Sequence, residues 1–403
     1  MGDGHPEFYD VIIIGCGISG IDMAYRMQTD CPCRSYVVLE RSSGIGGTWR
    51  LFNYPGVRSD SDMVTFGFSW KPWCSPTVIS PKEGIMEYLH AAVSENNIQR
   101  NIRFNTGVAS ADFRTAEGHW VVTTEHGDQL SSQFLYAATG YYHHDRGFSP
   151  VFAGVESFQG VVAHPQHWPA DLSCHGKRVV VIGSGATAVS LVPALAEQAA
   201  HVTMLQRTPT YYYASPQDDW ISRLLMAWLP DFVATWLVRW RNILGYVWNF
   251  QLCMLLPSIA KADLLRRARR ELPELPEAEF VRHFTPPYYP WQQRICLTPV
   301  PLDRARSPAL PSPFFSPQDG DFFSPLRTGR ASIVTDRVDH FAPKGLQLAS
   351  GRFLEAQSNL LPPQLTHPRA DRIAGRPTWS SPQQGCEWRS VVMRGSGFAP
   401  GSS

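Results

Sequence analysis

Residues 158–188 of the chain read FQGVVAHPQHWPADLSCHGKRVVVIGSGATA. Within this stretch, Val179 to Ile182 is a short apolar run rich in β-branched residues, which predicts a strand buried on both faces. Gly183, Ser184 and Gly185 follow directly and predict a tight turn into a helix. A strand, a glycine-rich turn and a helix in this order form the phosphate-binding element of dinucleotide-binding domains.

A second element of this kind lies far upstream, where residues 9–14 predict another buried strand. The glycines of its turn are Gly15, Gly17 and Gly20. A helix is expected from residue 18 to about residue 28, with its N-terminal amides facing the phosphates. The next strand, residues 36–39, ends at Glu40, where a carboxylate can accept hydrogen bonds from ribose hydroxyls. Because one chain with two such turns can hold two dinucleotides, we expect an α/β fold with two Rossmann-like domains.

Length and composition fit this expectation. At 403 residues, with 43% hydrophobic and 18% charged residues, the chain is typical of a globular protein of about two domains. The net charge of +1 gives no electrostatic reason to expect a nucleic-acid partner. The first ten residues carry no basic patch followed by an apolar core, so a cytoplasmic location is expected. Cys31 and Cys33 have neither redox-pair nor zinc-site spacing, and no metal site is predicted.

The segment after Glu40 contains Gly46-Gly47-Thr48-Trp49 and then YPGVRSD from Tyr54 to Asp60. This pattern resembles that of flavin-dependent monooxygenases, and among them the Baeyer–Villiger group, which carries GGxW, four residues and YPGxxxD. The resemblance implies that the first turn binds FAD, that Gly47, Thr48 and Trp49 contribute to the flavin site, and that Asp60 belongs to the active site. On its chemistry alone, we would favour the interpretation of Asp60 as an ordinary loop carboxylate that caps a turn.

The flavin disulfide reductases also bind two dinucleotides, but they need two cysteines after their second glycine-rich element. This chain has no cysteine between Cys33 and Cys74, which argues against dithiol chemistry.

Residues 158–169 match the spacing F-x-G-x-x-x-H-x-x-x-W-P, which resembles the fingerprint of type I Baeyer–Villiger monooxygenases. Relatives that oxygenate nitrogen and sulfur usually end the motif with other residues than Trp168-Pro169. The histidine of the motif, His164, is open to two interpretations. We favour a structural residue that couples domain movement over a catalytic acid.

The second turn predicts a nicotinamide cofactor. Its candidate binding residues are Gly183, Ser184, Gly185, Thr187, Arg207 and Thr208. Arg207 follows the strand expected at residues 201–205, where an NAD site would place an acidic residue. A guanidinium suits a 2′-phosphate because it can form two parallel hydrogen bonds. NADPH is therefore the expected reductant.

Residues 220–270 predict a helical insertion with apolar residues at spacings of three and four. Charged residues interrupt the pattern, so no uncharged run long enough to span a bilayer is present. Two interpretations remain, a cap over the substrate entrance or peripheral contact of residues 220–260 with a membrane. We favour the cap.

Arg294 lies in PWQQRICL, which resembles the segment where Baeyer–Villiger monooxygenases place their active-site arginine. The resemblance implies that Arg294 is catalytic and that Asp60 holds it through a bidentate pair. It further implies an enzyme that uses FAD, NADPH and O2 to insert one oxygen atom into a ketone through a peroxyflavin, with a thioether as a second substrate class. The alternatives are an N- or S-oxygenating flavin monooxygenase and an inactive remnant that binds nucleotide without turnover.

The expected domain plan follows. Residues 1–145, with part of 319–356, form the FAD domain, and residues 146–215, continuing at about 280–300, form the NADPH domain. Residues 216–280 form the helical insertion, and 301–318 are a Pro-rich insertion. Residues 357–403 are rich in Pro, Ser, Gly and Arg and are expected to be disordered, without the strand that a relative would carry there. Substrate identity and oligomeric state are not readable from these patterns.

Overall fold

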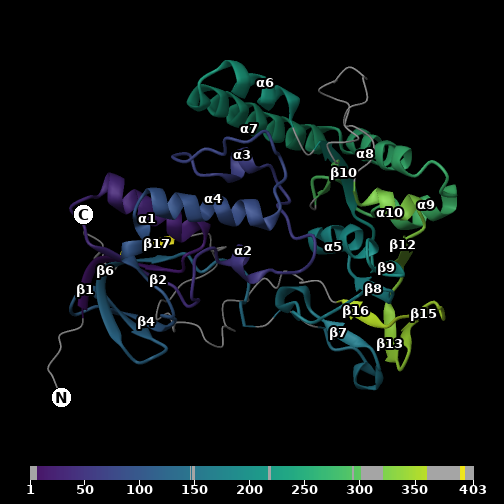
Figure 1. Cartoon of the computed structure of the whole chain (residues 1–403), viewed down its shortest axis with the longest axis horizontal. Helices are drawn as coiled ribbons and strands as arrows, with labels where there is room; N and C mark the ends of the chain where they lie inside the picture. Colours follow the sequence, from purple (N-terminus) through teal and green to yellow (C-terminus); the bar gives the residue numbers. More distant parts are fainter. Residues whose placement is uncertain are drawn as a thin grey trace, which may run out of the picture. The chain divides into compact units, whose positions relative to one another are not determined.

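The computed structural model describes residues 7–145, 147, 150–216, 219–292, 295–300, 321–360 and 391–394. They divide into two compact units (Figure 1). The first unit comprises residues 7–51, 83–145 and 391–394, and the second comprises residues 52–82 and the described part of 147–360. The α/β fold with two Rossmann-like halves is confirmed, and each unit is described by itself below.

The first unit is built on a seven-stranded mixed sheet in the order β3-β2-β1-β6-β5-β4, with β17 paired to β6. Its elements are β1 (Glu7–Ile14), α1 (Ile18–Asp30), β2 (Tyr36–Leu39), α2 (Thr48–Leu51), α4 (Lys82–Glu95), a 3₁₀ turn (Ile98–Asn101), β3 (Ile102–Arg103), β4 (Val108–Arg114), β5 (His119–Thr124), β6 (Gln129–Ala137) and β17 (Val391–Arg394).

In this sheet β1 pairs in parallel with β2 on one side and with β6 on the other, so its four last residues are buried on both faces. Helix α1 packs against β1 and β2 (Figure 1). The antiparallel hairpin β4-β5 extends the sheet beyond β6 and adds Trp120 and Val122 to the core. This arrangement brings the carboxyl ends of β1 and β2 to the same edge of the sheet as the start of α1.

The second unit contains a five-stranded parallel sheet in the order β12-β9-β8-β16-β7 and two small sheets, β10-β11 and β13-β14-β15. Its strands are β7 (Val161–Ala163), β8 (Arg178–Ile182), β9 (His201–Gln206), β10 (Tyr211–Pro216), β11 (Ile295–Val300), β12 (Ala331–Thr335), β13 (Val338–Ala342), β14 (Gly345–Leu348), β15 (Phe353–Glu355) and β16 (Ser358–Leu360). Its helices are α3 (Met63–Phe66), α5 (Ala186–Ala196), α6 (Trp220–Trp228), α7 (Asp231–Leu255), α8 (Pro257–Glu271), α9 (Glu277–Phe284) and α10 (Phe323–Arg327), with 3₁₀ turns at Val155–Ser157 and Pro165–His167.

The helical insertion expected at residues 216–280 consists of α6, α7, α8 and the start of α9. Among the described helices, none is by itself long and apolar enough to cross a membrane. The pair α7 and α8 passes that test only when the two are joined, and they are bent by 113° relative to each other.

Two parts of the expected domain plan differ from the structure. Residues 331–335 form β12, which pairs in parallel with β9, so the described residues 321–356 lie in the second unit and not with the first glycine-rich turn. The tail was expected to lack regular structure and a completing strand. Instead, Ser358–Leu360 pairs with both β7 and β8, and Val391–Arg394 pairs with β6; the rest of 361–403 lies outside the described residues.

The reason for the second difference is visible at Ser358. Its side chain is fully buried in the parallel sheet, and its hydroxyl has no hydrogen-bond partner there. A short strand with a polar sequence carries no apolar periodicity, so only its long-range pairing identifies it.

The Pro-rich insertion expected at residues 301–318 lies outside the described residues, but residues close to it on both sides are described. The backbone N–H of Asp321 donates to the carbonyl of Pro299 at 2.9 Å. Directly after Asp321, Phe322 and Phe323 are fully buried, and Phe322 stacks on Tyr212 with ring centroids 4.7 Å apart. Residues 299 and 321 are therefore adjacent in the structure.

Candidate dinucleotide sites

The first glycine-rich turn is closely packed. A Cβ on Gly20 would overlap the carbonyl oxygen of Gly15, so only glycine lets α1 pack this closely on the turn. Gly15 has φ +98°, a backbone conformation that L side chains rarely adopt, and its Cβ would lie 2.7 Å from the carbonyl oxygen of Ala138. Helix α1 begins after Gly17 without a side-chain cap. Its first amides are therefore available to a phosphate group.

Glu40 braces this turn from the end of β2. Its Oε2 accepts a hydrogen bond from the backbone N–H of Cys16 at 2.7 Å, and its Oε1 accepts from the backbone N–H and the hydroxyl of Ser42, both at 2.8 Å. The side chain is 8% exposed. A carboxylate has about four lone-pair sites, so ribose hydroxyls can still bind it. The sequence placed Glu40 correctly at the carboxyl edge of the sheet.

The second glycine pair meets the first turn within the same unit. Gly46 donates its N–H to the carbonyl of Cys16 at 2.9 Å, and a Cβ on Gly47 would lie 3.1 Å from Cα of Gly17. Two bare stretches of main chain thus face each other. Thr48 and Trp49 start α2, and both side chains are half-buried. This glycine-lined cradle fits a flat, phosphate-bearing cofactor such as FAD.

The cysteines give no sign of dithiol chemistry. The free thiols among the described residues are Cys16, Cys31, Cys33, Cys74, Cys174, Cys253 and Cys296. Burial, with a smaller contribution from the Glu40 carboxylate, raises the pKa of Cys16 to about 12. The one cysteine inside the first turn is therefore a protonated thiol at neutral pH.

The second glycine-rich turn is more open. Gly183 follows β8 and donates its N–H to the carbonyl of Leu205 at 2.7 Å, while the hydroxyl of Ser184 donates to the carbonyl of Thr208 at 3.2 Å. Helix α5 begins after Gly185 without a side-chain cap, and no atom lies within 4 Å of the position a Cβ on Gly185 would take. The exposed Arg207 follows β9. These features fit a phosphate-bearing dinucleotide.

Residues Tyr54 to Asp60 lie in the second unit, although Gly46 to Trp49 of the same expected fingerprint lie in the first. The Tyr54 hydroxyl is hydrogen bonded to Thr187 in the first turn of α5; burial raises the pKa of Tyr54 and this hydrogen bond opposes the shift. A Cβ on Gly56, which has φ +78°, would lie 2.5 Å from the carbonyl oxygen of Ser190. The loop that carries Asp60 is thus seated on the helix of the second turn.

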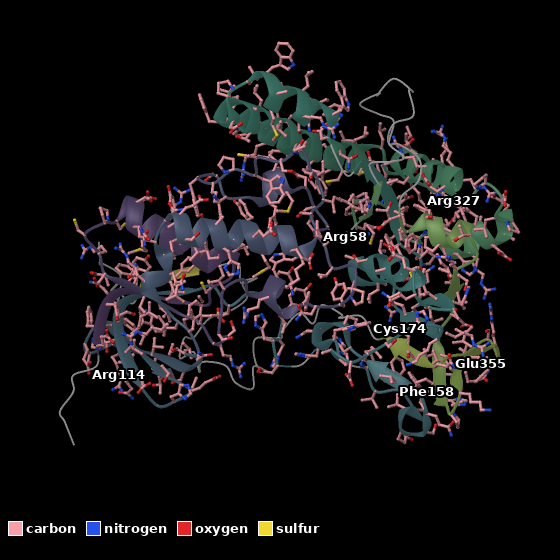
Figure 2. All side chains as sticks on the ribbon, in the orientation of Figure 1. Arg58, Arg114, Phe158, Cys174, Arg327 and Glu355 are labelled. Carbon is pink, nitrogen blue, oxygen red and sulfur yellow. The ribbon has the colours of Figure 1, made fainter. Side chains whose placement is uncertain are left out.

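The same loop is fixed by an ion pair that sequence reasoning missed. Both guanidinium Nη atoms of Arg58 (labelled in Figure 2) donate to the carboxylate of Asp321, one of them at 3.2 Å. Burial raises the pKa of Asp321, and the Arg58 charge opposes that shift. The pair joins residues 263 positions apart, and no local pattern signals it. Asp60, two residues on, is exposed.

The predicted catalytic arginine, Arg294, lies outside the described residues, and so does any pairing with Asp60. It stays a prediction.

The linker fingerprint packs into the second unit. The ring of Phe158 (Figure 2) lies edge to face on Phe341, with centroids 5.8 Å apart. His164 caps the following 3₁₀ turn, since its Nδ1 accepts from the backbone N–H of Gln166 at 3.2 Å. A structural role for His164 is consistent with this contact.

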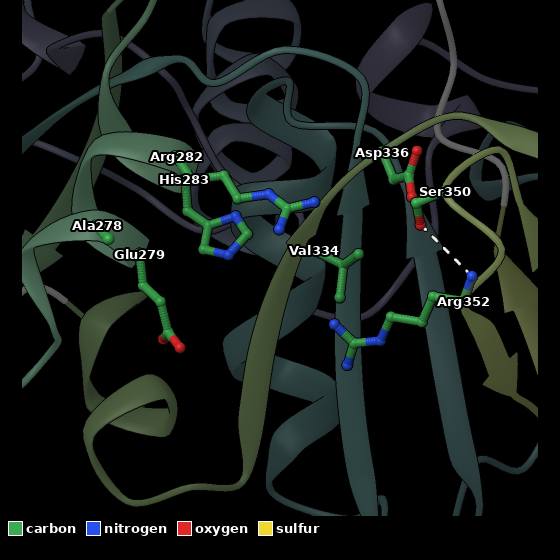
Figure 3. A pocket seen from close by; sticks show the side chains of 8 residues that line it. All are labelled: Ala278, Glu279, Arg282, His283, Val334, Asp336, Ser350 and Arg352. Atoms are coloured by element: carbon green, nitrogen blue, oxygen red, sulfur yellow. Dashed lines mark hydrogen bonds between the residues drawn. The ribbon is translucent and has the colours of Figure 1, made fainter.

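A pocket of about 350 Å³ lies at the carboxyl edge of the second sheet (Figure 3). Its lining residues are Ala278, Glu279, Arg282, His283, Val334, Asp336, Ser350 and Arg352. Burial, and next the charge of Arg282, lower the pKa of His283, which disfavours the charged imidazolium. The lining contains two guanidinium groups, of Arg282 and Arg352, and two carboxylates, of Glu279 and Asp336, which leaves no excess charge to select an ionic ligand.

Two turns of this kind define a protein of the two-dinucleotide oxidoreductase class, and comparison with known proteins narrows it. A family model described as pyridine nucleotide-disulphide oxidoreductase matches residues 12–229. The FAD-containing monooxygenase EthA of Mycobacterium tuberculosis is 44% identical over 354 residues, which cover 87% of this chain and 68% of EthA. The probable FAD-binding monooxygenase AlmA of Acinetobacter baylyi is 41% identical over 352 residues, which cover 86% of this chain and 66% of AlmA.

Solved structures share the fold. An oxidized steroid monooxygenase bound to NADP superposes with a TM-score of 0.68 at 22% identity, covering 88% of this chain and 71% of that one. Cyclohexanone monooxygenase of Rhodococcus sp. Phi1 bound to NADP+ gives 0.68 at 20% identity, covering 90% and 71%. The chain belongs to the family of FAD-containing monooxygenases. The monooxygenase class and the flavin cofactor expected from the sequence are confirmed.

Proposed function

We propose that this chain is an FAD- and NADPH-dependent monooxygenase that inserts one oxygen atom of O2 into a ketone and gives the ester. NADPH supplies two electrons, one oxygen atom enters the ester, and the other leaves as water. The observation that carries the proposal is the presence of two dinucleotide turns with uncapped helix N-termini, with the Asp60 loop seated on the helix of the second. The solved neighbours, which include cyclohexanone and steroid monooxygenases, are consistent with it.

The residues divide the work between the two turns. In the first, the amides of residues 17–20 would hold the FAD pyrophosphate, Glu40 would accept the ribose hydroxyls, and Gly47, Thr48 and Trp49 would flank the flavin. Bound FAD supplies hydride acceptance and the activation of O2. In the second, Gly183 to Thr187 would hold the NADPH pyrophosphate.

The specificity for NADPH is assigned to the end of β9. Arg207 would bind the 2′-phosphate through its guanidinium, and Thr208 would add a hydroxyl donor. Both side chains are exposed, so a cofactor can reach them without rearrangement of the core.

The experiment is product analysis with the full chain, NADPH and ¹⁸O2, with a cyclic ketone and a thioether in parallel. The proposal predicts a lactone that carries one ¹⁸O atom. Exclusive formation of sulfoxide would overturn the ketone assignment and leave an S-oxygenating enzyme.

Arg294, proposed from the resemblance alone, is tested with Arg294→Ala. We expect oxygenated product to fall by at least about a hundredfold, as for removal of one transition-state donor, while NADPH still reduces the flavin. Unchanged product formation would remove Arg294 from the mechanism.

A further inference from the structure

Helices α6 and α7 expose an unusually apolar surface, here called the Trp face. Its exposed residues are Trp220, Leu224, Trp228, Phe232, Trp236, Leu237, Trp240, Leu244, Val247, Trp248 and Leu255. The two helices pack side by side (Figure 1). Trp228 is 80% exposed, Leu255 75% and Phe232 74%. Scattered exposed apolar side chains are normal, but a contiguous set of this size marks an interaction surface.

In the N-terminal half of α7 the exposed apolar residues Phe232, Trp236 and Trp240 recur at a spacing of four, so they lie on one side of the helix. Residues 244–252 are all exposed, Asn249 and Gln251 among them. Two polar side chains of the first half face the protein. Arg239 donates to the carbonyls of Val64 at 3.1 Å and Gly67 at 2.8 Å, and Asn242 donates to the carboxylate of Asp62 at 3.0 Å.

The neighbouring Arg241 pairs with Asp219 at the start of α6. A helix on the surface of a protein in water normally buries its apolar side and exposes the polar one. The hydrogen bonds of Arg239 and Asn242 hold one side of α7 against the segment around Asp62, so the apolar residues on its other side stay exposed.

The composition and charge of the segment indicate what covers this face. Five of the exposed residues are tryptophans, the side chain enriched where proteins meet the headgroup level of a bilayer. Residues 219–271 contain eight Lys and Arg against four Asp and Glu, a net charge of +4, whereas the whole chain carries +1. Arg223 on α6 and Arg266 and Arg270 on α8 are exposed. A segment that carries both exposed apolar and exposed basic side chains complements an anionic lipid surface.

We propose that α6 and α7 dock the protein on an anionic phospholipid membrane, with the tryptophans of the Trp face at headgroup depth and the exposed arginines of α6 and α8 against lipid phosphates. The proposal does not depend on which substrate the enzyme oxidises.

The test is co-sedimentation of the full chain with vesicles of phosphatidylglycerol and phosphatidylcholine, compared with vesicles of phosphatidylcholine alone. We expect at least about tenfold stronger binding to the anionic vesicles and a marked weakening at 0.5 M salt, because salt screens the attraction between basic side chains and anionic headgroups. No binding to anionic vesicles would overturn the proposal.

The matched variants separate the Trp face from general hydrophobicity. The triple substitution Trp228→Ser, Trp236→Ser, Trp248→Ser removes exposed side chains only and is expected to weaken vesicle binding about tenfold or more with unchanged thermal unfolding. The control Val151→Ser, Phe353→Ser changes exposed apolar residues elsewhere in the same unit and should bind like the wild type.

Equal vesicle binding by the triple variant and the wild type would contradict the proposal. A second outcome would also contradict it. If the wild type sedimented as a self-associated species and the triple variant as a monomer, with no difference in vesicle binding, then a second copy of the chain would cover the Trp face. The variant Arg223→Gln, Arg266→Gln, Arg270→Gln should lose the preference for anionic over neutral vesicles; an unchanged preference would overturn the charge assignment.

Discussion

The two glycine-rich turns share a sequence pattern but differ in how closely the protein surrounds them. In the first, Gly20 and Gly47 are in contact with neighbouring main chain, and the nearly buried Glu40 holds the turn through two of its partners. In the second, the space over Gly185 is empty, and Arg207 and Thr208 are exposed. A closed cradle suits a cofactor that stays bound through many turnovers, and an open one suits a cofactor that must exchange. The difference supports the proposed placement of FAD as a resident cofactor in the first turn and of NADPH as an exchangeable one in the second.

The largest difference is expected between two alanine substitutions. In Gly20→Ala the new methyl group would overlap the Gly15 carbonyl, which should cost about 3 kcal/mol of unfolding free energy and release FAD. In Gly185→Ala the methyl group meets no protein atom, so stability should change by less than about 0.5 kcal/mol. NADP+ affinity should fall instead. Urea unfolding, flavin content and NADP+ titration check the pair, and equal destabilisation by both substitutions would break the comparison.

The brace on the first turn is tested by Glu40→Gln. The amide keeps the shape of the side chain but replaces one oxygen by an NH2 donor. That donor would stand opposite the N–H of either Cys16 or Ser42, which each bind a different oxygen of Glu40. We expect a loss of about 2 kcal/mol, the usual worth of hydrogen bonds to a charged group, together with weaker FAD retention on desalting. The control Glu125→Gln removes an exposed ion pair with Arg41 and should cost under about 1 kcal/mol. Retention of FAD by Glu40→Gln at the wild-type level would show that the brace is dispensable.

The proposed binding of the NADPH 2′-phosphate at the second turn is tested by Arg207→Ala. Loss of a charge-assisted contact with the 2′-phosphate should raise the Kd for NADPH roughly tenfold and leave that for NADH unchanged. The control is Arg178→Ala. Arg178 is the first residue of β8, at the end of that strand away from Gly183, and its substitution should change the Kd of neither cofactor. The two constants come from anaerobic flavin-reduction kinetics. An equal loss of affinity for NADPH and NADH would mean that Arg207 does not bind the 2′-phosphate.

The smallest effect is a difference in thiol reactivity. Because the pKa of Cys16 is raised to about 12, its thiolate is scarce at every pH below that value, and burial also blocks access. Iodoacetamide at pH 8 should therefore modify the exposed Cys31 and Cys33 and spare Cys16 until the protein unfolds. Peptide mass spectrometry reads the modification at each position. Modification of Cys16 at the rate of Cys31 would contradict a closed first turn.

The sequence predicted what is local. Each βα turn is recognisable within about thirty residues, because a buried β-branched strand, glycines and a helix follow one another. The strand predicted at residues 36–39 coincides with β2. Strand pairing between segments far apart in the sequence could not be predicted from local patterns. The polar strand β16 and the membership of β12 in the second sheet depend on partners more than a hundred residues away.

The same limit applied to the site. Glu40 was found because it directly follows a strand, whereas the pairing of Arg58 with Asp321 and the hydrogen bonds of α7 to the segment around Asp62 join distant segments. Which side of α7 is exposed could not be inferred from spacing, since an apolar stripe shows only that a helix has two faces. Which face is turned to the protein is decided by tertiary hydrogen bonds.

The most direct test of the two-turn account is the visible spectrum of the purified full chain before and after desalting, followed by anaerobic addition of NADPH. The account predicts a yellow protein that keeps FAD through desalting, loses any nicotinamide nucleotide, and is bleached by NADPH. A colourless protein that cannot be reconstituted with FAD, or a flavin that NADPH does not bleach, would contradict it.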